Sequence, residues 1–102
     1  MKSTLRVLGV ALIAAPLFFS QAAVADGAGL FKSKGCAGCH GADAMGAVGP
    51  RLAGQQEKYV AEQFKLIRDG KRASGKSPMM AGAVKSVSDA DADAIAAYVS
   101  GL

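Results

Sequence analysis

The sequence predicts a small all-α domain built from three or more short helices. Two segments, residues 56–69 and 89–100, repeat apolar side chains at three- and four-residue spacing, which is the period of a helix with one buried face. No segment shows the alternation typical of a strand, and the chain has no internal repeat. Only 6% of the residues are aromatic, so the predicted core contains few large side chains. A small domain with such a core usually needs a covalent or metal support.

The first 25 residues are typical of a secretory signal peptide. Lys2 and Arg6 supply positive charge, an apolar run follows over residues 7–19, and a small-residue cleavage site ends at Ala25. The apolar run is too short to cross a bilayer comfortably. The alternative to a cleaved signal peptide is an uncleaved membrane anchor. We therefore predict export to the periplasm, removal of residues 1–25 and a single domain over residues 26–102.

The first two predicted helices flank a glycine-rich loop. A short helix over residues 28–34 leads to Gly35, and a longer one over residues 56–69 ends at a glycine that suits a helix C-cap. Residues 41–54 show no regular periodicity and are expected to form a loop, as are residues 70–78. The buried stripe expected on the second helix consists of Tyr59, Val60, Phe64 and Ile67.

The third predicted helix runs over residues 89–100. Ser88 is a good N-cap, and the aspartates that follow it favour the positive N-terminal end of the helix dipole. We therefore interpret this acidic cluster as a helix-start signal. The buried stripe expected on this helix consists of Ile95, Tyr98, Val99 and Leu102.

The segment Cys36-Ala37-Gly38-Cys39-His40 carries the strongest functional signal. Two cysteines separated by two residues and followed by a histidine indicate the covalent attachment of one c-type haem. Each thiol can add to one of the two vinyl groups of the same macrocycle, and the histidine then lies beneath the iron, which it can ligate.

Three other interpretations of these five residues are weaker. A redox-active dithiol usually lies in a βαβ unit, which this sequence does not show. A closed zinc site needs four ligands, but the chain offers only two cysteines and one histidine, so carboxylates would have to complete it. A structural disulfide suits an exported protein but leaves the adjacent histidine unexplained.

A second iron ligand decides whether the haem carries electrons or binds small molecules. His40 is the only histidine, so a methionine thioether is the expected partner. Met45 follows His40 too closely to wrap around the haem edge easily, whereas Met79 and Met80 follow two helices and a loop. Both are alternatively ordinary core methionines, but their place directly after Pro78 favours ligation.

The order of a short helix, C-x-x-C-H, a Gly-Pro loop, a helix, a methionine loop and a final helix resembles a class I cytochrome c. The likeness covers essentially all of residues 26–102 and is closer still to one domain of the periplasmic dihaem class I cytochromes c. This closer likeness rests on the segments 49–55, 63–64, 68–70, 79–82, 88–89 and 96–98, together with Tyr59.

The resemblance implies roles for individual residues. Cys36 and Cys39 would form the thioether bonds to the haem, and His40 would be the proximal iron ligand. The carbonyl of Pro50 would accept a hydrogen bond from the other ring nitrogen of the histidine. The distal methionine of similar chains stands eight residues before the serine that caps the last helix, which selects Met80, with Met79 as the alternative. Unlike the dihaem proteins, this sequence has one such domain, and Gly35 leaves the contact of the first helix with the last one open.

From these residues we predict a periplasmic carrier that passes one electron between redox proteins and is not an enzyme. The first alternative is a haem-bearing subunit of a periplasmic dehydrogenase or oxidase complex. The second is a five-coordinate cytochrome that binds gases or catalyses a reaction. Tyr59 and Arg68 are possible partners of a haem propionate, but a core tyrosine and an exposed helix-end cation are the more common roles.

The charge of the predicted domain limits its partners. The whole chain has a net charge of +4, but Lys2 and Arg6 belong to the leader, which leaves ten basic against eight acidic side chains. This balance does not support nucleic-acid binding. Basic residues between positions 65 and 85 could steer an acidic redox partner. We expect no stable membrane insertion after cleavage and a monomeric protein.

Overall fold

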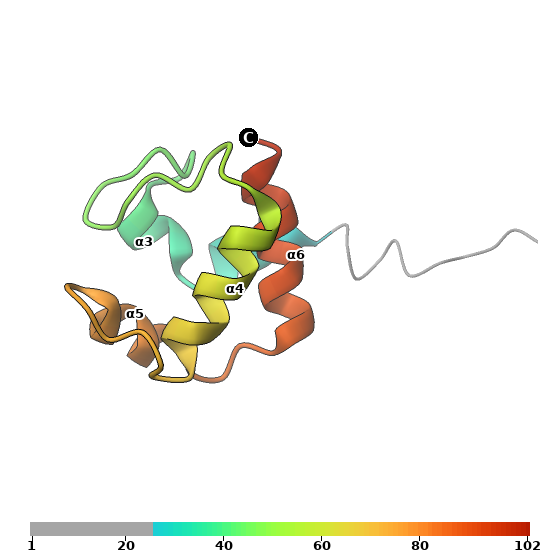
Figure 1. Cartoon of the computed structure of the whole chain (residues 1–102). Coiled ribbons are helices and arrows are strands. Elements are labelled where there is room, and N and C mark those ends of the chain that lie inside the picture. Colours follow the sequence, from blue (N-terminus) through green and yellow to red (C-terminus); the bar gives the residue numbers. More distant parts are fainter. Residues whose placement is uncertain (1–25) are drawn as a thin grey trace, which may run out of the picture.

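The computed structural model describes residues 26–102, and the predicted signal peptide lies outside the described residues. Within the described range the chain forms helices and no strand, which confirms the predicted all-α class. Figure 1 shows the helices in chain order, and they are α2 (Gly27–Ser33), α3 (Cys36–His40), α4 (Glu57–Arg68), α5 (Ser77–Val84) and α6 (Asp89–Ser100).

Helix α6 is the central packing element, because both α2 and α4 lie against it. Its side chains Ile95 and Val99 are the largest fully buried ones among the described residues. Phe31 of α2 and Phe64 of α4 join them in one apolar cluster. Helix α5 packs on α4 and lies away from α2 and α6.

The approach of α2 to α6 is close because a glycine stands at the contact. A Cβ atom at Gly27 would collide with the carbonyl oxygen of Ala94 and would lie 2.7 Å from the Cβ of Tyr98. One turn further along, the rings of Phe31 and Tyr98 pack with their centroids 5.7 Å apart. The structure therefore shows the contact between the first and the last helix that the sequence left open.

Gly35 separates α2 from α3 and explains why the first helix ends there. Its φ of +78° lies in the left-handed region, which glycine adopts at little cost. The chain turns at this point and begins a new helix at Cys36, so the attachment motif is itself helical.

Helix α5 corrects the sequence prediction. Residues up to Lys76 form the expected surface loop, but Ser77 to Val84 are helical, so both candidate methionines lie on a helix and not in a loop. Pro78 fits because proline is tolerated in the first turn, where its missing N–H has no intrahelical partner.

Two side chains that were expected in buried stripes are exposed. Tyr59 is 49% exposed and Leu102 is 52% exposed. Helix α6 ends at Ser100, so its periodicity does not extend to Leu102. Tyr59 lies in the first turn of α4 and borders a cavity. In the described part of the chain, no helix is long and apolar enough to cross a membrane.

Candidate functional site

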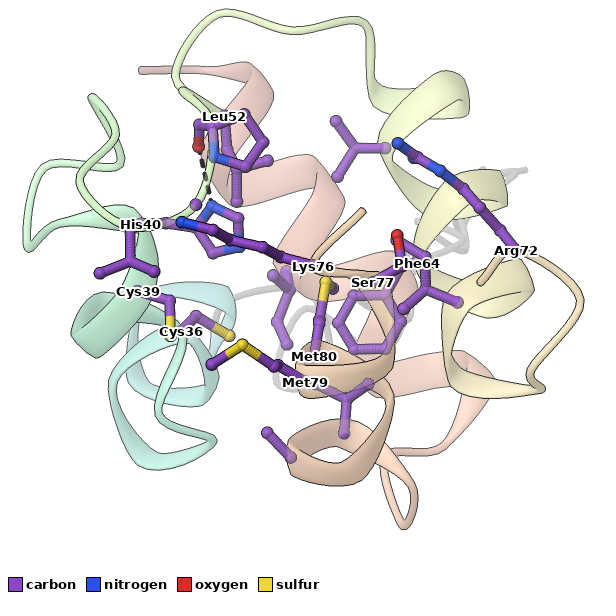
Figure 2. Close-up of a pocket in the computed structure, with 18 of the residues that line it drawn as sticks. Cys36, Cys39, His40, Leu52, Phe64, Arg72, Lys76, Ser77, Met79 and Met80 are labelled. Atoms are coloured by element: carbon purple, nitrogen blue, oxygen red, sulfur yellow. Dashed lines mark hydrogen bonds between the residues drawn. The ribbon is translucent and has the colours of Figure 1, made fainter. Parts of the chain in front are cut away.

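A cavity of about 490 Å³ opens between α3, α4, α5 and the loop around residues 48–55. Its size falls in the range of about 300–1,000 Å³ typical of cofactor and ligand sites. Figure 2 shows the two cysteines and His40 on one side, with the side chains of Met79 and Met80 entering the view from α5. The cavity therefore gathers the predicted site residues Cys36, Cys39, His40 and Met80, although they come from distant parts of the chain.

The imidazole of His40 is fixed by the loop that follows it. The side chain is 7% exposed, and its Nδ1 atom lies 2.8 Å from the carbonyl oxygen of Pro50. Because a carbonyl oxygen only accepts hydrogen bonds, Nδ1 carries the proton and donates it. Nε2 then carries the lone pair that a metal ion requires. This is the bond to Pro50 that the family resemblance implies.

Gly49 makes room for the imidazole ring. A Cβ atom at this position would lie 2.7 Å from Cε1 and 2.8 Å from Nδ1 of His40. The backbone of the loop is held in place as well, because the N–H of Gly49 donates to the carbonyl of Cys39 at 2.7 Å. Backbone bonds and close packing therefore fix the ring orientation.

The two cysteines are separate thiols on the cavity wall. Cys36 is partly buried and Cys39 is exposed. Burial raises the pKa of the Cys36 thiol, whereas a redox-active dithiol needs a thiol with a lowered pKa. Among residues 26–102, moreover, no group of three or more His, Cys, Asp or Glu side chains is arranged to hold a metal ion. The raised pKa weighs against the dithiol interpretation of the motif.

The three methionines of the described residues occupy different positions. Met80 is partly buried and packs against the apolar core. Figure 2 shows its side chain directed into the cavity. Met79 borders the same cavity but is 67% exposed, and Met45 is 48% exposed and belongs to the loop outside it. Of the three, Met80 is the one that is both partly buried and directed into the cavity.

Arg68 does not have either of the two roles considered for it. Its side chain is only 14% exposed and bonds to Asp69 and Asp89, so it is neither an exposed helix-end cation nor a cavity residue. The cavity is bordered instead by four other basic residues, namely Lys34, Arg51, Arg72 and Lys76. The sequence analysis did not place these four at the cavity, because their approach depends on how the loops fold. Tyr59 and the buried Ser77 also border it.

Comparison with known proteins identifies the family. Residues 24–102 match the family model described as cytochrome c. The chain is 43% identical over 103 residues to cytochrome c-553 of Nitratidesulfovibrio vulgaris, a match that covers 95% of this chain and 98% of that protein. It is 40% identical over 100 residues to the thiosulfate dehydrogenase electron acceptor of Thiomonas intermedia, with 95% of this chain and 44% of that protein covered.

A further relative is a cytochrome c4 of Pseudomonas aeruginosa, which is 42% identical over 73 residues, or 70% of this chain and 35% of that protein. The chain thus spans less than half the length of the electron acceptor and of cytochrome c4. This agrees with the predicted resemblance to a single domain of a longer class I cytochrome.

The chain belongs to the cytochrome c family. It is a class I cytochrome c that carries covalently bound haem c and transfers electrons. The cavity fits that group in chemistry as well as in size. Two thiols and an imidazole with a free lone pair stand on one wall, a thioether stands on another, and apolar side chains such as Phe64 and Ile95 lie between them.

Proposed function

We propose that this protein is a periplasmic one-electron carrier in which Cys36 and Cys39 hold the haem and His40 and Met80 ligate its iron. The observation that carries the proposal is that His40 and Met80 line two walls of the same cavity. His40 stands on one wall with Nδ1 bonded to Pro50, and Met80 projects into the same cavity from α5. Haem c supplies one-electron chemistry, because its iron is stable in both the ferric and the ferrous state.

The protein's own residues restrict that chemistry to electron transfer. Met80 would occupy the position at which a small molecule otherwise binds the iron. Pro50 holds the imidazole of His40 in one orientation and increases its basicity. The apolar side chains of Val60, Phe64 and Ile95 line the cavity and limit access of water. An apolar surrounding and a thioether ligand both favour the less charged ferrous state, so we expect a raised reduction potential.

Substitution of the methionines tests the ligand assignment. The weak near-infrared absorption band of ferric haem bound by methionine sulfur should be present in the wild type and in Met79→Ala. It should be absent in Met80→Ala, whose reduced form should also bind carbon monoxide at neutral pH. Met79→Ala is the matched control, because it removes the same group from the adjacent position of α5. Loss of the band in Met79→Ala alone would assign the ligand to Met79.

Carbon monoxide binding also separates the carrier from the five-coordinate alternative. A six-coordinate wild-type protein should bind the gas slowly or not at all, because Met80 must first leave. Rapid binding to the reduced wild type, with no near-infrared band in its ferric form, would contradict the proposal and favour a gas-binding or catalytic protein.

A dehydrogenase is the electron donor that the relatives favour. Proteins from Thiomonas intermedia and Stutzerimonas stutzeri that resemble this chain are named thiosulfate dehydrogenase electron acceptors. We propose that the electron donor is a periplasmic dehydrogenase. Mixing the ferric protein with thiosulfate dehydrogenase and thiosulfate, and following reduction of the haem, tests one member of this class. Copurification of the protein with a larger polypeptide would instead favour the complex-subunit alternative.

The basic residues available to steer a partner are fewer than the sequence suggested. Lys65 is paired with Asp93 and Arg68 with Asp69 and Asp89, which leaves Lys71, Arg72, Lys76 and Lys85. Arg72 and Lys76 border the haem cavity, where they are best placed to attract an acidic partner. Reduction by the partner should become slower as salt is added, and a rate that is independent of salt would contradict steering.

A further inference from the structure

We propose that Arg68 is a positioning residue for Met80: it ties down the segment that follows α5 and thereby keeps the distal ligand in the cavity. This inference rests on the proposed ligation by Met80. It concerns a side chain that does not touch the cavity and that no comparison assigns a role.

Helix α5 makes few packing contacts with the rest of the protein. Of the five described helices it packs against α4 alone, and only two of its residues, Ser77 and Val84, are buried. Its N-terminus has no side-chain cap and follows the exposed loop over residues 70–76. The position of Met80 therefore depends on how the two ends of α5 are attached to the rest of the molecule.

The C-terminal attachment runs through Val87. The N–H of Val87 donates to the carbonyl of Val84, the last residue of α5, at 3.0 Å. Both valines are 3% exposed and belong to the apolar core. The carbonyl oxygen of Val87 accepts a hydrogen bond from Nη1 of Arg68, also at 3.0 Å. A polar bond therefore joins the segment after α5 to the last residue of α4.

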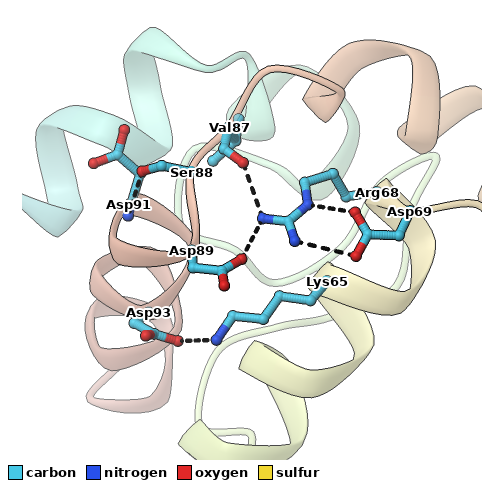
Figure 3. A network of polar contacts seen from close by, with 8 residues as sticks. All are labelled: Lys65, Arg68, Asp69, Val87, Ser88, Asp89, Asp91 and Asp93. Carbon is cyan, nitrogen blue, oxygen red and sulfur yellow. Dashed lines mark hydrogen bonds and ion pairs between the residues drawn. The ribbon is translucent and has the colours of Figure 1, made fainter.

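Arg68 connects three elements through one guanidinium group, as Figure 3 shows. It bonds both carboxylate oxygens of Asp69, with Nε at 2.8 Å and Nη2 at 3.2 Å. Its Nη1 lies 2.7 Å from Asp89, the first residue of α6. With the bond to Val87, the same side chain links the end of α4, the start of α6 and the segment between α5 and α6. A lysine ammonium lacks the planar fork that serves these acceptors together.

Lys65 provides a natural comparison one turn earlier on α4. It lies 2.8 Å from Asp93 of α6, so it also pairs the two helices, and its side chain is 31% exposed. It makes no bond to the segment after α5 within the described residues. Lys65→Gln and Arg68→Gln therefore remove the same charge from the same helix and the same helix pair. They differ in the tie to Val87 and in the two bonds to the neighbouring Asp69, which Arg68 makes and Lys65 does not.

The test heats the ferric holoprotein and records two signals, the near-infrared band of the methionine-ligated haem and the helical circular dichroism. In Arg68→Gln the band should disappear before the helices melt. We expect a separation of about 4–8 °C or more, because 4–8 °C is the shift produced by losing one hydrogen bond of average net strength in a domain of this size. In the wild type and in Lys65→Gln the two signals should disappear together. Arg68→Lys should resemble Arg68→Gln, because the charge alone does not replace the fork.

Each outcome is informative. A band and a helical signal that melt together in Arg68→Gln, at whatever temperature, would overturn the positioning role and leave Arg68 as a general stabiliser. Equal separation in Lys65→Gln would overturn it too, because the tie to Val87 would not matter. If Arg68→Gln fails to fold, Asp89→Asn weakens the anchoring of Arg68 more mildly and should show the same order of melting. Absence of the band in the wild type would instead refute ligation by Met80, and the positioning role with it.

Discussion

The two walls of the haem cavity are held in different ways. On the histidine wall, His40 is bonded through Nδ1 to Pro50 and packs directly against Gly49, so its fixing partners lie close to it in the sequence. On the methionine wall, Met80 lies on a helix whose own side chains contribute little burial. That helix is positioned by packing on α4 and by contacts beyond its two ends. His40 is therefore fixed locally, and Met80, the second proposed ligand, is fixed through tertiary structure.

This difference indicates which changes can displace each of the two proposed ligands. A change near His40 acts on the ring itself, because loop atoms already surround it at contact distance. A change near Met80 acts on the position of a whole helix, so residues remote from Met80 can displace its side chain from the cavity. With His40 and Met80 as the proposed iron ligands, a change that loosens α5 should release Met80 first, while His40 stays bound.

Truncation of Phe64 should have the largest effect on the methionine wall. This side chain is 4% exposed, lies on α4, belongs to the same apolar cluster as Val84 of α5, and forms part of the cavity lining. Phe64→Ala should lower the free energy of unfolding by about 3–5 kcal/mol, as for other large-to-small core changes. Guanidinium unfolding of the ferric holoprotein measures it. A loss below about 1 kcal/mol would show that the core does not depend on this side chain.

Gly49→Ala tests the histidine wall. Its new methyl group would lie 2.7–2.8 Å from two atoms of the His40 ring, so either the ring or the loop must move. We expect a loss of about 1–3 kcal/mol in the free energy of unfolding, the usual cost of overpacking. Nuclear magnetic resonance should also show a displaced His40 ring. An unchanged stability and an unchanged spectrum would mean that the loop is softer than the backbone bonds suggest.

Gly82→Ala is the matched change on the methionine wall. Gly82 is an exposed residue of α5, and a Cβ atom there meets nothing within 4 Å. Alanine favours the helix over glycine, so this variant should gain about 0.4–1 kcal/mol in the free energy of unfolding. The near-infrared band should also survive to a higher temperature. A loss of unfolding free energy in Gly49→Ala with a gain in Gly82→Ala would support the contrast between the two walls. Equal losses in the two variants would contradict it.

The sequence predicted the locally determined parts of the molecule. Helix α6 has the expected limits, and the side chain of Ser88 caps it by accepting a hydrogen bond from the N–H of Asp91. This cap could be predicted because Ser88 and the aspartates that follow it lie within one helical turn. The cofactor was predicted as well, since C-x-x-C-H is contiguous. The bond between His40 and Pro50 followed from the family resemblance, and the structure contains it.

Helices α3 and α5 were not predicted, for a physical reason. The first has five residues, too few to show a period. The second reads Ser-Pro-Met-Met-Ala-Gly-Ala-Val, which has no polar face, so no stripe distinguishes it from an apolar loop. Its helical state depends on packing against α4. Arg68 was misjudged for a related reason, because its partners Asp89 and Val87 reach it only in the folded chain.

The smallest expected effect is on the acid stability of the protein, through the ion pair between Arg68 and Asp69. Arg68 holds the pKa of the Asp69 carboxyl below its usual range, chiefly through their hydrogen bond. A carboxyl with a lowered pKa in the folded state stabilises the fold fully above its unfolded pKa, about 3.9, and loses that contribution as the pH falls toward the folded value. Stability should therefore decline below about pH 4 less steeply in Asp69→Asn than in the wild type.

Arg68→Gln provides the matching control for this acid effect, because it removes the cause of the shift while keeping the carboxyl. Its stability profile below pH 4 should run parallel to that of Asp69→Asn. Because the Asp69 side chain is 45% exposed, solvent screens the pair and the change in slope should be small. Urea unfolding at several pH values measures it. Identical slopes in the wild type and both variants would show that the Arg68–Asp69 ion pair adds nothing to the stability.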